Sequence, residues 1–151
     1  METYIGVKIV HAEPREGIGR KSYAEVTDLS RDIADLEDGY RVQYKDGYAS
    51  WCPKDTFEKA NFKIVGKNGI DRQDIENFIK TVQVSTIGKR TTVVVVELIN
   101  GYKIIESASC IDSSDYSELI GKEKCMKKVR EKVWFLLGFL LQSALSGFKT
   151  E

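Results

Sequence analysis

The sequence contains little histidine, cysteine or proline, and no excess of charge of either sign. Its 151 residues include one His, three Cys and two Pro, and 23 Lys and Arg balance 23 Asp and Glu. With His11 as the single histidine and no close pair of cysteines, neither a zinc-binding spacing nor a Cys/His nucleophile can be composed. Balanced charge creates no overall field that attracts nucleic acid. We therefore expect no metal, no cofactor and no nucleic acid polymer as a partner.

The cysteines also argue against a disulfide framework. Cys52, Cys110 and Cys125 are widely spaced and odd in number, which favours reduced thiols. The first residues show no apolar core behind a basic region, so no targeting segment is expected and cytosolic residence is the default. The uncharged run from Val133 to Phe148 has 16 residues and includes Gln142, whereas a membrane span needs about 20. We expect no association with a membrane.

The first part of the chain is predicted to form a small β module. Residues 4–10 (YIGVKIV) suit a strand, and residues 13–38 indicate a loop with at most a short helix. In GYRVQYKDGYASW, apolar and polar residues alternate around an Asp46-Gly47 turn, which predicts a hairpin. The segment CPKDTFEKANF then predicts a helical turn that packs Phe57 and Phe62 back onto the hairpin.

Residues 64–70 (IVGKNGI) indicate a connection, so we expect one domain at 1–66 and another at 67–151. In the second, Ile75, Phe78, Ile79 and Val82 have helical spacing. The segment from Ser85 to Leu98 predicts one strand, whose four consecutive valines are typical of a strand covered on both faces.

A hairpin turn at 99–102 follows, and Lys103 to Cys110 returns as the partner strand. The chain is therefore predicted to be an α+β protein. An antiparallel sheet, made of the hairpin 85–110 and the N-terminal strands, packs with helices 71–82 and 122–145.

The last helix is unusually apolar near its end. Nine residues from Val133 to Leu141 carry no charge, so the helix is apolar around its whole circumference there and must be covered on all sides. Either the N-terminal elements or an identical chain supplies the cover. We favour self-association, as a dimer or a multiple of dimers, through Val133, Trp134, Leu137 and Leu141.

Few residues suggest chemistry. Six basic groups lie between Lys122 and Lys132, and most are expected to be solvated. Arg130 differs because it borders the apolar face, where a planar guanidinium suits phosphate or an aromatic ring. Tyr102 at the hairpin turn is either a lid over the core or a platform on which a base stacks. Further candidate hydrogen-bond donors are Lys89, Arg90, Thr92, Ser107 and Ser113.

No set of residues resembles a catalytic site. Asp112, Asp115 and Glu118 precede a helix, where acids cap and complement the helix dipole, and no companion histidine is available. The serines and Cys110 lack a partner base. We expect a protein that is not an enzyme.

The residues TTVVVVELINGYKIIESASCID, with a helix before them and KVREKVWFLLGFLL after them, resemble a family of small tailed-phage proteins that includes the Thoeris anti-defence sponge proteins. The resemblance covers about residues 71–145. It implies a protein that holds a cyclic ADP-ribose isomer intact, and in some members a cyclic oligonucleotide, so that the host effector is not activated. Two departures are Tyr102, where the family usually has Phe, and residues 113–115, where it often has a Pro-Glu-Asn type stretch.

The resemblance therefore predicts a sponge in the host cell cytoplasm. In this hypothesis Tyr102 stacks on adenine, Arg130 with Lys89 or Arg90 contacts the pyrophosphate, and Thr92 and Ser107 bind ribose hydroxyls. Ser113 is a further candidate, for a ribose or a phosphate. The alternative is a structural or host-takeover interaction module with no small-molecule ligand. A phosphodiesterase is a weaker alternative, because no histidine-containing or metal-ready site can be assembled.

Overall fold

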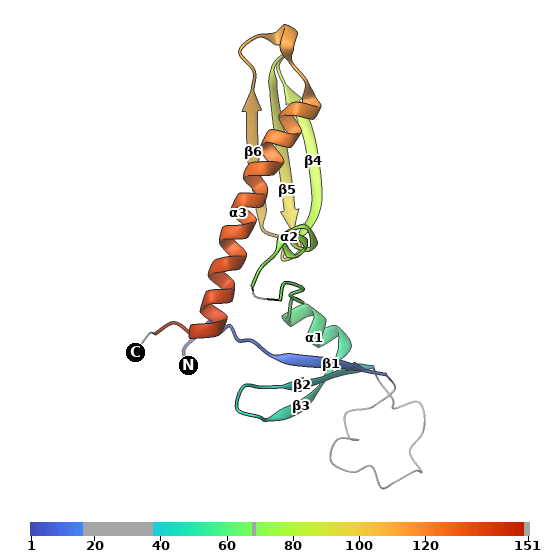
Figure 1. The fold of residues 1–151 in the computed structure, drawn as a ribbon, viewed down its shortest axis with the longest axis vertical. Coiled ribbons are helices and arrows are strands. Elements are labelled where there is room, and N and C mark those ends of the chain that lie inside the picture. Colours follow the sequence, from blue (N-terminus) through green and yellow to red (C-terminus); the bar gives the residue numbers. More distant parts are fainter. Residues whose placement is uncertain (17–37, 68, 150–151) are drawn as a thin grey trace. The chain divides into compact units, whose positions relative to one another are not determined.

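The computed structural model describes residues 1–16, 38–67 and 69–149, and it confirms an α+β fold. Within these residues there are two three-stranded antiparallel sheets, each associated with helices (Figure 1). The predicted single sheet is therefore two sheets. The chain divides into two compact units, Met1–Lys63 with Ser143–Glu151 and Ile64–Gln142. Each unit is described by itself.

The first unit contains a sheet of order β1-β2-β3, with one short helix. Its elements are β1 (His11–Arg15), β2 (Gly39–Gln43), β3 (Ala49–Pro53) and α1 (Lys54–Ala60). The predicted β2–β3 hairpin is confirmed, and Gly47 takes the positive φ of 87° that its turn requires. The ring of Phe57 on α1 stacks on Tyr40 of β2 at 4.3 Å, which confirms the packing predicted for Phe57.

The strand predicted at residues 4–10 is wrong, because β1 lies at His11–Arg15 instead. These five residues pair one for one with all five residues of β2, from His11 opposite Gln43 to Arg15 opposite Gly39. The partner strand therefore has no length left for residues 4–10. Part of the predicted loop at 13–38 is thus strand, and residues 17–37 lie outside the described residues.

The second unit contains the other sheet, of order β4-β5-β6, and the long helix α3. Along the chain its elements are α2 (Arg72–Phe78), β4 (Ile79–Ile87), β5 (Thr91–Leu98), β6 (Lys103–Ser109), the 3₁₀ turn Ser113–Asp115 and α3 (Glu118–Ser146). In Figure 1, α3 runs along one face of this sheet. Helix α3 begins four residues earlier than predicted.

Two predicted elements of this unit are corrected. The helix predicted at 71–82 ends at Phe78, and the single strand predicted from Ser85 to Leu98 is the end of β4, a turn and β5. In KTVQVST, β-branched residues alternate with polar ones, and this period of two wins over the helical spacing once the segment pairs with β5. Gly88 supplies the positive φ of 63° at the turn between the strands.

Helix α2 starts with a reciprocal cap. The Asp71 carboxylate accepts a hydrogen bond from the Asp74 N–H at 3.1 Å, and Asp74 accepts from the Asp71 N–H at 3.0 Å. The buried Asp74 carboxylate also accepts from the N–H groups of Val65 and Gly66. Burial alone would raise the pKa of Asp74, but these backbone donors outweigh burial and hold it below its ordinary value. Asp74 thus links the segment that contains Val65 and Gly66 to α2.

The turn between β5 and β6 confirms the prediction at residues 99–102. The Leu98 N–H donates to the Tyr102 carbonyl at 2.8 Å, and the Tyr102 N–H donates to the Asn100 side chain at 3.1 Å. Gly101 takes a φ of 84° between them. This turn places the Tyr102 side chain at one end of the sheet.

The core of the second unit lies between α3 and one face of the sheet. Alternate residues of β5 are buried, whereas Val93 and Val95 on the other face are only half-buried. The four valines are therefore covered well on one face only, not on both as expected. Where the helix crosses β5, a Cβ on Gly121 would overlap the Thr92 hydroxyl, so glycine allows the close approach. The buried residues are Thr92, Val94, Val96 and Leu98 on β5 and Cys125, Met126, Val129, Val133 and Leu137 on α3.

Candidate functional site: a groove between β6 and α3

An open groove of about 680 Å³ lies between β6 and the middle of α3. One wall is the turn and β6, and the other is a flank of α3 on which residues recur every three or four positions. Two exposed aromatic rings line the groove: Tyr102 is 60% exposed and Phe135 is 73% exposed. The full lining is Tyr102, Lys103, Ile104, Ile105, Glu106, Lys128, Glu131, Lys132, Phe135 and Leu136.

Charged contacts join the two walls. Lys128 donates from Nζ to the Ser107 carbonyl at 3.2 Å, and Lys132 forms an ion pair with Glu106. Three lysines and two glutamates line the groove, which gives a net charge of 3 − 2 = +1. Because both rings and the lysine side chains are accessible, the groove can take a flat aromatic group together with an anion.

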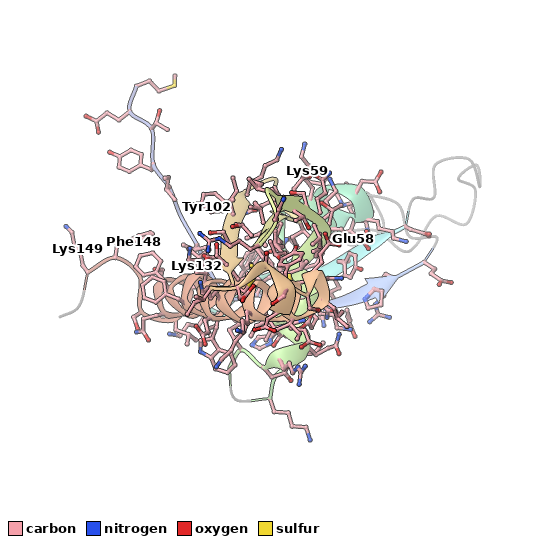
Figure 2. All side chains as sticks on the ribbon, turned by 90° about the horizontal axis from the view of Figure 1, so that it is seen from above. Glu58, Lys59, Tyr102, Lys132, Phe148 and Lys149 are labelled. Atoms are coloured by element: carbon pink, nitrogen blue, oxygen red, sulfur yellow. The ribbon has the colours of Figure 1, made fainter. Side chains whose placement is uncertain are left out.

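Tyr102 is the sequence-predicted site residue that lies in this groove. Figure 2 shows Tyr102 and Lys132 on the same side of α3, in agreement with their shared place in the lining. Ser107 is close to the groove through its carbonyl, which accepts from Lys128. Its side chain belongs to the other face of the sheet, since Glu106 next to it faces α3.

Arg130 lies on the opposite flank of α3. Its Nε donates to Glu76 on α2 at 2.5 Å, whereas Lys132, two positions and about 200° further around the helix, meets β6. The two candidates given the most weight, Tyr102 and Arg130, are therefore separated by the helix in the single chain. The contact with Glu76 assigns Arg130 a place in joining α3 to α2.

The remaining candidates lie at the other end of the sheet from Tyr102. Lys89 and Arg90 occupy the β4–β5 turn, and an Arg90 guanidinium nitrogen donates to the Ile111 carbonyl at 2.8 Å. Thr92 is fully buried, with its hydroxyl 2.9 Å from that of Tyr116, and Ser113 starts the 3₁₀ turn. One chain does not bring these four residues to the groove, and their roles stay predictions.

Sequence reasoning missed most of the groove. Lys128 and Lys132 were grouped with the solvated lysines, and Glu106 and Phe135 were not considered. A signal was present: Ile104 and Glu106 alternate with exposed residues of β6, and Lys128, Lys132 and Phe135 share one helical flank. Local spacing does not say which flank faces β6, because that depends on how the helix packs.

Some of the residues predicted to mediate self-association are buried in the single chain, and others are exposed. Val133 is 0% exposed and Leu137 is 2% exposed, so both are already buried in the single chain. Trp134 is 52% exposed. Four further apolar residues between Trp134 and Gln142 are also exposed: Phe135, Leu136, Phe139 and Leu140.

Two searches of the described residues bear on alternative functions. Across residues 1–16, 38–67 and 69–149, no group of three or more His, Cys, Asp or Glu side chains is placed to hold a metal ion. Within the same ranges, no helix has the length and apolar character that crossing a membrane requires.

Comparison with known proteins identifies one family. Residues 70–145 match the model of the phage protein (N4 Gp49/phage Sf6 gene 66) family, which is 76 of the 151 residues. The match includes all of β4, β5, β6 and the groove. No curated protein and no solved structure matches the chain.

Proposed function

The chain belongs to the phage protein (N4 Gp49/phage Sf6 gene 66) family, and from this premise we propose that it is a non-enzymatic trap for a nucleotide immune signal. The ligand is a cyclic ADP-ribose isomer or a related cyclic nucleotide, held intact in the cytoplasm of the infected host. Retention of the signal blocks a Thoeris-like defence, because the host effector then receives no activator.

The groove between β6 and α3 is the observation that carries this proposal. A nucleotide offers a flat base and an anionic pyrophosphate, and the groove offers exposed Tyr102 and Phe135 rings beside Lys103, Lys128 and Lys132. Stacking of a base on an aromatic side chain contributes about 1 to 3 kcal/mol. Lysines act as point charges for phosphate oxygens. A protein that only holds a nucleotide needs base stacking and phosphate binding, and it needs no reactive group.

A second copy of the chain is the proposed cover of the groove, which is open in the single chain. Phe135 and Leu136 line the groove and continue into the exposed Trp134 and Leu140 on the same helix. Burial of this apolar surface favours association, since about 25 cal/mol is gained for each Å² removed from water. A second copy seated there adds a wall beside the bound nucleotide. The proposed assembly is a dimer or a multiple of dimers.

The proposal predicts that Tyr102→Ala weakens binding of a cyclic ADP-ribose isomer by about tenfold or more, because the stacking surface is lost. Tyr102→Phe is the matched control and should bind within about threefold of the wild type, since the ring remains. Isothermal titration calorimetry measures both variants. Heat denaturation of the wild-type complex should then release unmodified nucleotide, identified by chromatography.

Three results would count against the trap. Absence of heat with every isomer tested favours the alternative role as an interaction module without a small-molecule ligand, for which the exposed apolar surface of α3 is the supporting feature. Recovery of a cleaved nucleotide would indicate an enzyme. Equal binding by Tyr102→Ala and the wild type would move the site away from this groove.

A further inference from the structure

The two edges of the β4-β5-β6 sheet differ in how they are protected against the addition of another strand. An edge strand presents unpaired backbone N–H and C=O groups, and proteins commonly block such an edge with lysine, proline or a bulge. At the β6 edge, Lys103 begins the strand and the Lys128 ammonium donates to the Ser107 carbonyl. At the β4 edge, Lys80 and the register shift both come before residue 81. Residues 81–87 (TVQVSTI) contain no charge, proline or glycine.

Hydrogen bonds at the two ends of the β5–β6 ladder show which backbone groups of β4 are unpaired. The Leu98 N–H donates to the Tyr102 carbonyl at one end, and the Cys110 N–H donates to the Arg90 carbonyl at the other. Even-numbered positions of β5 therefore bond to β6, and odd-numbered positions bond to β4, because successive residues direct these groups to opposite sides of a strand. The register places odd-numbered residues of β4 opposite them. Three residues of β4 thus direct their N–H and C=O groups away from β5: Val82, Val84 and Thr86.

This edge is accessible along its length. Residues 81–87 are exposed apart from Val84, which is half-buried. In the part of the chain that the structure describes, β4 is the last strand of its sheet, and β5 is the one strand that pairs with it. The Thr86 hydroxyl bonds to Tyr116 and Glu118, but this contact uses the side chain and leaves the backbone groups of Thr86 available.

We propose that the β4 edge is a self-association surface, at which β4 of a second copy adds antiparallel about a two-fold axis beside Val84. In this register Val84 pairs with Val84 of the other copy, Val82 pairs with Thr86, and Gln83 pairs with Ser85. Every outward backbone group of residues 82–86 then meets a matching one. A two-fold contact requires a strand that matches itself in reverse, and an uncharged strand brings no like charges together.

The contact extends the self-association part of the proposed function and does not depend on the ligand. It uses a different surface from the exposed apolar residues of α3, to which a second copy is already assigned. A chain with two different two-fold surfaces assembles beyond a dimer, which favours a multiple of dimers. Because β4 and β6 are opposite edges of the sheet, pairing at β4 leaves the groove beside β6 open to its ligand.

The test is Val82→Pro in the full chain. Proline lacks the N–H that an added strand needs, and it is tolerated on an edge strand where that N–H faces solvent. The control is Ile105→Pro, the same change at the β6 edge, where the alternation also directs the N–H outward. By sedimentation velocity the wild type should be larger than a dimer and Val82→Pro should be a dimer, with the β4 contact weakened by at least about tenfold. Ile105→Pro should keep the size of the wild type, and a melting curve for each variant checks its fold.

A second pair of variants tests the register without proline. Val84→Cys should form a disulfide between copies under mild oxidation, because opposed Cα atoms in a hydrogen-bonded antiparallel pair lie about 5.5 Å apart, within the range for a disulfide. Val82→Cys is the control, since residue 82 is four positions, or about 14 Å, from its own copy along the strand. The wild type, which contains Cys52, Cys110 and Cys125, gives the background.

The outcomes separate this contact from the proposed function. A monomeric wild type contradicts both the proposed assembly and the β4 contact. If the wild type associates and Val82→Pro keeps its full size, or if Val84→Cys cross-links no more than Val82→Cys, the β4 contact alone is overturned. Absence of nucleotide binding, measured by calorimetry, contradicts the trap and not the β4 contact.

Discussion

The two halves of α3 differ in how their apolar residues are used. From Glu118 to Val133, the buried residues lie three or four positions apart along one face, at Gly121, Cys125, Met126, Val129 and Val133, and charged residues occupy most of the exposed positions. From Trp134 to Gln142 there is no charge, yet Leu137 is the residue of this half that is fully buried. The first half exposes two large apolar residues, Leu119 and Ile120. The second half has more, which is the reason to expect a second copy there.

The largest effect is expected from a substitution that prevents the first half of α3 from packing closely on the sheet. Gly121→Ala places a methyl group where the Thr92 hydroxyl lies, and Thr92 is on a central strand that cannot move aside freely. We expect the free energy of unfolding to fall by about 3 kcal/mol, at the upper end for overpacked cores. Urea denaturation followed by circular dichroism measures it. An unchanged midpoint would show that α3 does not pack on β5 at this distance.

The second half is tested by removing an exposed apolar side chain outside the groove lining. Trp134→Ser should weaken self-association by at least about tenfold, or about 1.4 kcal/mol, because large aromatic residues dominate interfaces. Sedimentation velocity over a range of concentrations measures the change. Lys124→Ser, an exposed change in the first half, is the control and should leave association as it is. Equal association by both variants would remove Trp134 from the interface.

The same contrast explains what could be predicted from the sequence. The two hairpin turns were predictable because Gly47 and Gly101 take positive φ values at positions flanked by alternating strands. Strand β4 was missed because Ile79 and Val82 continue the helical spacing of Ile75 and Phe78, and only pairing with β5 shows that this segment is a strand. Structure that depends on residues close in sequence could therefore be predicted, whereas structure that depends on the pairing of strands could not.

The candidate site follows the same rule. Tyr102 was found because its turn is local, whereas Glu106 and Lys132 are 26 positions apart and meet only once β6 and α3 pack together. Arg130 was chosen for its place at the border of the apolar face. That border has two flanks, and the structure puts Arg130 on the flank that meets Glu76. The spacing of residues along a helix does not specify which neighbour each flank receives.

The smallest predicted effect concerns a glycine in the second half of α3. Gly138 has nothing within 4 Å of the position of an added Cβ, in contrast to Gly121 in the same helix. Gly138→Ala should therefore raise the free energy of unfolding by about 0.5 to 1 kcal/mol, because alanine restricts the unfolded chain and favours the helix. Urea denaturation at a concentration where the protein is monomeric measures this gain. A gain in stability that is absent only at concentrations where the wild type associates would mean that the added methyl group obstructs the second copy. In that case Gly138 lies within the interface.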